Sequence, residues 1–354
     1  MLERVRIGMV GAGAVAARHV RTLLAMEGVE VAAVADPALD RARELADEAG
    51  AAAYPNHMEL LDGERLDAVY VCVPPFAHGA PELAVIDAGL PLFVEKPVAI
   101  DQETAATIAA RLGRRPLITC TGYHWRWLDI FDRAAELLAD RPARLVQCFW
   151  LDKVPPPPWW PRRDGSGGQV IEQTTHVLDT ARALAGEVTE VHAFGARAAR
   201  PAATPPTTRS VAALPAADIH DVSVASLRFA SGAVGTVAST CLLPRLHRAG
   251  VQMVADGLSL ELSETELVVE VDGERSAWTS GASARPRPDA DFVAAVRGGP
   301  DRIRVPWPEA YRTHLLACAI TRSAEEGRPV HLTPEGSGEP RGGAPVDRDG
   351  DGHG

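Results

Sequence analysis

The feature that most constrains the fold is an alternation of short apolar runs and helical stretches in the first third of the chain. The apolar runs occupy residues 5–10, 29–36, 66–74, 91–97 and 116–123, and helical patterns occupy 15–26, 40–50, 78–89 and 102–113. Strands that are apolar on both faces and are joined by helices indicate a parallel sheet covered on both sides. The pattern therefore predicts an α/β, doubly wound nucleotide-binding domain over residues 1–121.

The pattern changes after residue 121 and predicts an α+β domain over residues 122–333. Helical patterns cover 130–139, 167–186, 289–299 and 308–327, and strand patterns cover 143–154, 187–196, 220–230, 233–243, 250–256, 258–264 and 266–273. Because short turns join most of these strands, we expect a mainly antiparallel sheet. The last two helices could return toward the first domain. Residues 197–217 are expected to form a loop, and residues 334–354, which have almost no apolar side chains, a disordered tail.

Composition narrows the class of protein. The formal net charge of −11 argues against a nucleic acid or an anionic membrane as the main partner. The five cysteines are scattered without a CxxC pair, which favours reduced thiols over a disulfide framework or a zinc site, and no metal is expected. No run approaches the ~18 apolar residues of a membrane span, and the chain begins with a predicted strand rather than a signal sequence. We therefore expect a cytoplasmic, enzyme-like protein.

The turn after the first predicted strand reads GAGAVA, and it is the candidate cofactor site. Its first glycine permits a tight turn, its second lets the backbone approach a pyrophosphate, and its last alanine lets helix and strand pack closely. The free N–H groups of the first helical turn would face the phosphates. The candidate contacts are Gly11, Gly13, Ala14, Val15 and Ala16. The alternative is a plain Gly-rich turn without a ligand.

Asp36 ends the second predicted strand, where the ribose of a bound dinucleotide would lie. Its carboxylate can accept hydrogen bonds from a ribose 2′-OH and would repel a 2′-phosphate, which favours NAD over NADP. Arg41 and Arg43 lie just beyond and could offset that preference, so NADP stays possible. The alternative role for Asp36 is a turn or helix-capping residue.

Two features carry candidate chemistry. Lys96, in the tripeptide EKP, lies at the carboxyl end of a predicted strand, where open α/β sheets bind their ligands. An ammonium there could stabilise a developing alkoxide, although a surface lysine is the simpler alternative. The helix at 167–186 places Glu172, His176 and Asp179 on one face. This row is either a set of catalytic groups or part of an amphipathic helix with a hydrogen-bonded core histidine.

Taken together, the motifs resemble those of the Gfo/Idh/MocA oxidoreductases, which include glucose–fructose oxidoreductase and inositol dehydrogenase. They are GAGAVA at 11–16, VPPFAH at 73–78, EKP at 95–97, GYHWRW at 122–127, GGQVIEQTTHVLD at 167–179, FASGAVGTV at 229–237 and the ending FVAAVRGG…EEGRPVHL. They follow the family's order across residues 5–332. The resemblance implies an N-terminal Rossmann domain and a C-terminal domain whose open, mainly antiparallel sheet forms a homodimer or homotetramer. It also implies NAD(P)-dependent oxidation or reduction at a carbon of a sugar or polyol.

The resemblance also assigns roles to the candidate residues. The family's lysine falls on Lys96, and its helix motif GGxxxDxxxHxxD falls on Gly167, Gly168, Glu172, His176 and Asp179. Glu172 stands where Asp is usual, which puts the usual substrate contact of this residue in doubt. His176 would act as acid and base, because histidine titrates near neutrality, while Lys96 would hold the substrate oxygen. Glu172 or Asp179 would orient the imidazole or bind a neighbouring hydroxyl.

Further candidates lie in loops near these motifs. Cofactor contacts are expected from Pro74, His78, Glu95 and Lys96, and substrate contacts from Tyr123, Trp125, Arg126, Trp159, Trp160, Glu172 and His176. His78 could equally serve to begin a helix, and some of the aromatic residues at 123–127 could be core. Trp159 and Trp160 follow four consecutive prolines, and a stiff loop that presents indoles suits stacking on a sugar face.

Three functions fit these residues. The first is a dehydrogenase or ketoreductase that acts on a sugar, a cyclitol or a sugar-like substrate. The second is an NAD-dependent glycoside hydrolase that holds its cofactor tightly, and net turnover of free cofactor distinguishes these two. The third is a non-catalytic nucleotide-binding protein, which the presence of both Lys96 and His176 disfavours.

Overall fold

The computed structural model describes residues 4–197, 217–281 and 286–333. The expected tail at 334–354 and all but the two ends of the expected loop at 197–217 lie outside the described residues. No helix in the described ranges combines the length and apolar character that a membrane span requires.

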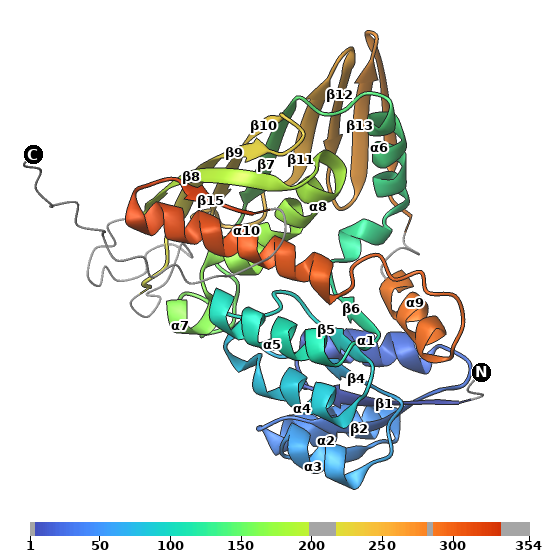
Figure 1. The fold of residues 1–354 in the computed structure, drawn as a ribbon. Coiled ribbons are helices and arrows are strands. Elements are labelled where there is room, and N and C mark those ends of the chain that lie inside the picture. The colour runs from blue at the N-terminus through green and yellow to red at the C-terminus, as the bar shows by residue number, and fades with distance from the viewer. Residues whose placement is uncertain (1–3, 198–216, 282–285, 334–354) are drawn as a thin grey trace, which may run out of the picture.

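The first unit is a six-stranded, all-parallel sheet with the order β3-β2-β1-β4-β5-β6. Its strands are β1 (Val5–Val10), β2 (Val29–Ala35), β3 (Ala52–Tyr54), β4 (Ala68–Val71), β5 (Leu92–Val94) and β6 (Thr119–Thr121). Its helices are α1 (Ala14–Leu24), α2 (Leu39–Ala49), α3 (His57–Gly63), α4 (Ala80–Ala88) and α5 (Gln102–Arg114). Helices lie on both faces of this sheet, in the blue and teal part of Figure 1. The prediction of a doubly wound parallel sheet is confirmed.

Two elements of this unit were not predicted. Strand β3 has three half-buried residues at the edge of the sheet, so it lacks the apolar run that marks the other strands. Helix α3 follows Asn56, whose side chain accepts a hydrogen bond from the backbone N–H of Glu59 at 2.9 Å. Strands β5 and β6 are shorter than their apolar runs, because the residues after each strand leave the sheet. Those departing residues build the candidate site.

The second unit is a nine-stranded sheet with the order β14-β13-β12-β11-β7-β10-β9-β8-β15. Its strands are β7 (Leu145–Leu151), β8 (Val188–Ala196), β9 (Val222–Phe229), β10 (Val234–Thr240), β11 (Arg248–Ala255), β12 (Leu258–Leu262), β13 (Glu266–Val271), β14 (Glu274–Thr279) and β15 (Val330–His331). All neighbours pair antiparallel except β7 and β10, as expected for a mainly antiparallel sheet. The edge strands β14 and β15 were not predicted, because β14 is almost wholly exposed and β15 has two residues.

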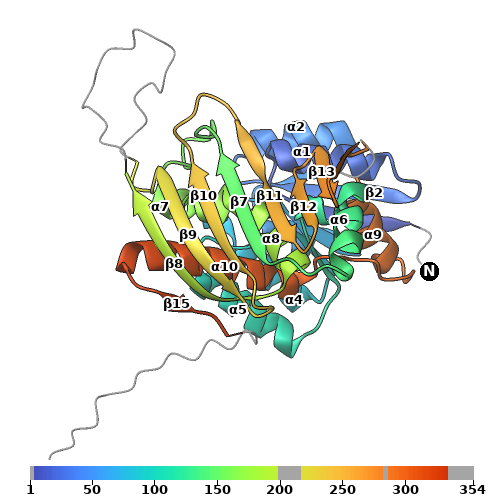
Figure 2. The same cartoon turned by 90° about the horizontal axis from the view of Figure 1, so that it is seen from above.

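One face of this sheet packs on helices α8 (Thr175–Ala185) and α10 (Trp307–Glu326). Figure 2 looks onto the opposite face, and none of the described elements lies over it. Buried and exposed residues alternate along β9, as they do in a strand that is covered on one side only. The exposed face carries the apolar side chains of Phe194, Val224 and Val234.

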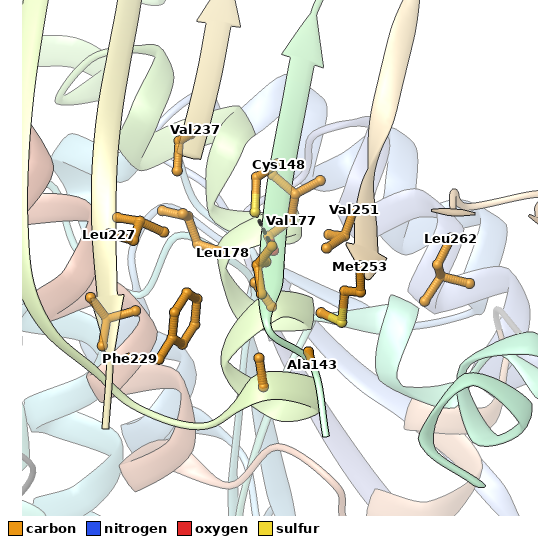
Figure 3. Packing of buried hydrophobic residues seen from close by; sticks show 14 of the residues in the cluster. Ala143, Cys148, Val177, Leu178, Leu227, Phe229, Val237, Val251, Met253 and Leu262 are labelled. Carbon is orange, nitrogen blue, oxygen red and sulfur yellow. Dashed lines mark hydrogen bonds between the residues drawn. The ribbon is translucent and has the colours of Figure 1, made fainter. Parts of the chain in front are cut away.

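The core under the second sheet holds helix α8 in place. Figure 3 shows Val177 and Leu178 among side chains from the strands of this sheet, including Phe229, Val237 and Met253. All five side chains are buried. Because this apolar contact fixes the helix on the sheet, the residues on its other sides are presented to the first unit and to α10.

The C-terminal helices return to the first unit. Helix α9 (Arg287–Val296) contributes Phe292 to the core of the parallel sheet, and the start of α10 contributes Trp307. Two hydrogen bonds of 2.9 Å join this segment to β6, from Thr121 N to the carbonyl of Val305 and from Trp307 N to the side-chain hydroxyl of Thr119. Further along, α10 contributes Leu316, Ala317, Ala319 and Ile320 to the core of the second unit. One helix therefore packs in both cores.

Candidate active site

The turn between β1 and α1 has a shape that requires glycine at its first position. Gly11 has a φ of +99°, and a Cβ atom there would lie 2.2 Å from the carbonyl oxygen of Cys72. Its N–H donates to the carbonyl of Ala35 at 2.7 Å, which ties the turn to β2. Ala16 is fully buried, so helix α1 lies close against the sheet. Gly11 and Ala16 thus have packing reasons to be small.

Gly13 has a different reason to be small. Its φ of −84° suits any residue, and a Cβ atom there would meet no protein atom within 4 Å. Helix α1 begins at the next residue without a side-chain cap, so no side chain of the described residues occupies the N–H groups of its first turn. Val15, in that turn, is 39% exposed. An open, uncapped helix N-terminus beside a glycine fits the pyrophosphate of NAD.

Asp36 lies beside this turn, just past the end of β2. Its Oδ2 accepts a hydrogen bond from the N–H of Ala12 at 2.9 Å, and its Oδ1 accepts one from the N–H of Ala38 at 2.8 Å. These bonds hold the carboxylate at the edge of the cofactor turn, where a ribose hydroxyl would reach it. Arg43 pairs with Asp40 at 3.2 Å on the exposed surface.

Lys96 and Glu172 meet across the two units. The Lys96 Nζ donates to the Glu172 carbonyl oxygen at 2.8 Å and to its Oε1 at 2.9 Å. The other carboxylate oxygen of Glu172, Oε2, accepts a hydrogen bond from the indole Nε1 of Trp160 at 2.6 Å. The Lys96 and Glu172 side chains are 16% and 15% exposed. Two of the predicted catalytic residues are therefore in direct contact.

The predicted regular helix at 167–186 begins with an irregular turn. Residues Val170–Thr174 form a π-helical turn, and α8 starts at Thr175. A π turn widens the helix and shifts the side chains on either side of it relative to one another. Glu172 and His176 consequently make no hydrogen bond with each other, and Glu172 is directed at Lys96 instead. The expected row of Glu172, His176 and Asp179 is thus not a hydrogen-bonded set.

His176 lies among aromatic side chains and is 7% exposed. Its ring centroid is 5.6 Å from that of Trp150, 6.1 Å from that of Trp125 and 5.3 Å from that of His124. Burial, followed by the positive charges of Lys96 and His124, holds the pKa of His176 well below its usual value of 6.5. The imidazole is therefore neutral at pH 7 and able to accept a proton.

Asp179 and Arg126 are paired with each other rather than directed at an open site. The Arg126 guanidinium donates from Nε to Asp179 Oδ2 at 2.7 Å and from Nη2 to Oδ1 at 3.1 Å. Thr313 of α10 adds a hydroxyl bond to the same carboxylate at 2.9 Å. Asp179 is 1% exposed. This placement corrects the expected orienting or substrate-binding roles of both residues, because the pair joins three segments of the chain instead.

The remaining aromatic candidates divide into buried and accessible side chains. Tyr123 is fully buried, with its hydroxyl 2.7 Å from that of Thr175, and Trp125 is 1% exposed beside His176. Trp160 is fully buried, so its ring offers no face to a sugar, and the expected stacking role is corrected for this residue. Trp159 is half-buried, and its ring centroid lies 6.3 Å from that of Phe76 on the turn after β4.

The turn after β4 contains Pro74 and His78. Pro74 precedes a short 3-10 turn, and His78 comes just before α4. The His78 side chain is fully buried, with Nδ1 2.5 Å from Oε1 of Glu82, and Glu82 Oε2 also accepts from the N–H of Gly79 at 2.6 Å. These contacts support the helix-start alternative for His78. Pro74 lies at the carboxyl edge of the sheet, where the cofactor contact remains a prediction.

A buried charge cluster behind Lys96 was not predicted. His19 of α1 lies between Glu95, 2.9 Å from its Nε2, and Asp289 of α9, 2.6 Å from its Nδ1. Burial opposes the charge on this imidazole, but Asp289 and Glu95 outweigh burial and raise the pKa of His19 to about 9. His19 and Asp289 are 270 residues apart in the sequence, so no local pattern could indicate their contact. Within the described residues, no group of His, Cys, Asp and Glu side chains forms a candidate metal site.

Comparison with known proteins places this geometry in a family. A family model described as "Oxidoreductase family, NAD-binding Rossmann fold" matches residues 5–123, and the GFO/IDH/MocA C-terminal domain matches residues 142–261. A myo-inositol 2-dehydrogenase of Thermotoga maritima is 29% identical over 66% of this chain and 67% of its own length. An inositol 2-dehydrogenase of Saccharopolyspora erythraea is 28% identical over 92% of this chain and 93% of its own length.

A solved structure shows the same fold. The WlbA dehydrogenase of Bordetella pertussis, in complex with NADH and UDP-GlcNAcA, has a TM-score of 0.79 and 19% identity, over 93% of this chain and 99% of that chain. The two family models together span most of the chain, and the described fold has both of the expected units. The chain therefore belongs to the Gfo/Idh/MocA family of NAD-binding oxidoreductases.

Proposed function

We propose that the protein is an NAD-dependent dehydrogenase that oxidises a secondary alcohol of a cyclitol or sugar, or reduces the corresponding ketone. One observation carries this proposal: Glu172 fixes the Lys96 ammonium at 2.9 Å, and His176, four residues beyond Glu172 in the same helical segment, is buried among aromatic side chains. A neutral base and a fixed cation are the two groups that alcohol oxidation needs from a protein. Relatives named as inositol dehydrogenases support the substrate class.

In the proposed reaction the side chains handle the proton and the charge. His176 takes the hydroxyl proton of the alcohol, and in the reverse direction it returns that proton to the ketone oxygen. Lys96, held by Glu172, stabilises the negative charge that develops on the same oxygen. Bound NAD would supply the hydride acceptor at nicotinamide C4. The cofactor would be held by the residues of the turn at 11–16 and by the Asp36 carboxylate.

We also propose that the enzyme works as a homo-oligomer. Phe194, Val224 and Val234 are 62%, 47% and 51% exposed on the face of the nine-stranded sheet that no described element covers. The strand pairing places Phe194 directly opposite Val224, so their side chains share that face. An exposed apolar sheet face is favourable when it is covered, and a second copy of the chain would cover it.

The experiment that tests the proposed activity is an NADH absorbance assay with free NAD and a panel of inositols and sugars. A dehydrogenase forms NADH in proportion to the alcohol consumed. A glycoside hydrolase with tightly held cofactor would cleave a glycoside without net NADH formation. A protein that binds NAD but changes none of these substrates would contradict the proposal.

A further inference from the structure

Trp160 is buried apart from the two main cores of the protein. It follows the four-proline segment and packs on Ile219, Cys241 and the neighbouring Val154. Its side chain is fully buried, yet its indole N–H is used in a short hydrogen bond to Glu172. A buried indole usually finds an acceptor for its N–H. The acceptor here is the carboxylate that holds Lys96.

The two oxygens of Glu172 are divided between two protein donors. Lys96 Nζ binds Oε1 at 2.9 Å, and Trp160 Nε1 binds Oε2 at 2.6 Å. A carboxylate that is bound on both oxygens cannot rotate about its last bond without breaking one of the contacts. Because Lys96 also donates to the Glu172 carbonyl at 2.8 Å, the position of its ammonium depends on how this one residue is held.

The length of the Glu172 side chain suits this double contact. The residue lies in the π turn, and Lys96 and Trp160 approach it from separate segments of the chain. With the backbone held in place, an aspartate would be one methylene shorter and would not reach both donors. The glutamate at 172 and the tryptophan at 160 therefore form a matched pair.

We propose that Trp160 is a positioning residue of the reaction, which acts through Glu172 to hold the Lys96 ammonium at the reacting oxygen. This inference rests on the proposed role of Lys96 in stabilising that oxygen. In this proposal Glu172 holds Lys96 and does not bind a substrate hydroxyl. The contribution of Trp160 then comes from its indole N–H and not from stacking of its ring face on a substrate.

Trp160→Phe tests the proposal, because it removes the N–H donor and keeps an aromatic ring; the packing lost with the rest of the indole is measured by the control below. A hydrogen bond to a charged group is worth roughly 1.5–3 kcal/mol, so we expect kcat to fall about ten- to a hundredfold with KM for the alcohol almost unchanged. A change confined to KM would overturn the proposal, because it would place Trp160 against the substrate.

Trp307→Phe is the matched control. Trp307 is 2% exposed, and its Nε1 has no hydrogen-bond partner among the described residues. The same substitution there removes the same atoms from a buried site without removing a hydrogen bond. It should leave kcat as it is in the unmodified enzyme. An equal fall in kcat for both variants would show that loss of packing, not loss of the N–H, explains the result.

A second measurement needs no turnover. Lys96 and Lys153 are the only two lysines of the sequence, so an amine-directed reagent labels two side chains besides the N-terminus. In cofactor-free protein, peptide mass spectrometry follows labelling of Lys96 against the exposed Lys153. Trp160→Phe and Glu172→Asp should each label Lys96 several-fold faster, because each frees its ammonium. Unchanged labelling would overturn the positioning role, even if no substrate had been found.

The double variant Trp160→Phe/Glu172→Asp shows whether the two residues act on Lys96 through one shared contact or independently. If Trp160 acts only through Glu172, Glu172→Asp should lower kcat by itself, and Trp160→Phe should add little to it. Independent losses that multiply in the double variant would contradict the proposal. Should Trp160→Phe not fold, Glu172→Asp alone carries the test through Lys96 labelling. Loss of activity in these variants without a change in Lys96 labelling would count against the positioning role alone. Full turnover by Lys96→Ala would count against the role of Lys96 itself, and thus against the proposed function.

Discussion

Replacing His19 with glutamine removes a buried cation that lies between two carboxylates. The pKa of this imidazole is raised from 6.5 to about 9, mainly because Asp289 and Glu95 outweigh the opposing effect of burial. One pH unit corresponds to about 1.4 kcal/mol, so charged His19 contributes about 3 kcal/mol to the free energy of unfolding. Glutamine is neutral, and we expect it to lose at least this amount near pH 6.

The pH dependence follows from the direction of the shift. The folded pKa lies above the unfolded value, so the contribution of His19 is complete below pH 6.5. It is lost as the pH rises from 6.5 through about 9, where the folded imidazole gives up its proton. The difference in unfolding free energy between the unmodified protein and His19→Gln should therefore be largest near pH 6 and should shrink toward about pH 10.

Urea unfolding at a series of pH values checks this prediction, with His247→Gln as the control. His247 is exposed, and its substitution should change the unfolding free energy little at any pH. A difference between the unmodified protein and His19→Gln that stays constant with pH would show that His19 acts by packing alone. A difference that grows at alkaline pH would refute the reasoning, since it would require a lowered pKa.

Three further predictions concern the site and the assembly. His176→Ala and Lys96→Ala should each lower turnover by ~10²–10⁴-fold while NAD binding, followed by fluorescence, is retained; the double variant should lose less than the product of the two losses. NAD should bind more tightly than NADP, and Asp36→Ala should reduce the difference between the two dissociation constants. Tighter binding of NADP by the unmodified protein would contradict the assigned role of Asp36. The protein should scatter light as a dimer or tetramer, and Val224→Glu should shift it toward monomer; a monomer before substitution would show that the sheet face is not an interface.

The parallel sheet and the cofactor turn could be predicted because their signals are local. Apolar runs of six or seven residues mark β1 and β2, and the glycines of the turn lie between the strand and helix that they join. The positions of Lys96 and His176 also follow from local order, one after a strand and one in a buried helix. The edge strands β3 and β14 could not be predicted, because they are too short or too exposed to give an apolar pattern. The π turn could not be predicted either, because no sequence period marks it.

The contacts within the site could not be predicted, because they join distant segments. The partner of Asp179 is Arg126, which is 53 residues away in the sequence, and the partner of Lys96 is Glu172, which is 76 residues away. Helical spacing alone suggests that Glu172, His176 and Asp179 act together, but tertiary contacts separate them. Two adjacent indoles likewise look equivalent in sequence, although burial makes Trp160 a hydrogen-bond donor to the protein and leaves Trp159 partly accessible.

The return of α9 and α10 to the parallel sheet has a consequence for dissecting the gene. The nucleotide-binding unit is discontinuous, because Phe292, Val305 and Trp307 fill part of the core that residues 1–121 begin. A fragment that stops at residue 121 would expose the apolar surface that these side chains cover, and it should aggregate rather than fold. A chimera that takes this unit from a relative must therefore take both residues 1–121 and the segment from α9 to the start of α10. The second junction between the two parent sequences then lies inside α10. The smallest transplantable module is set by shared packing, not by the order of the motifs along the chain.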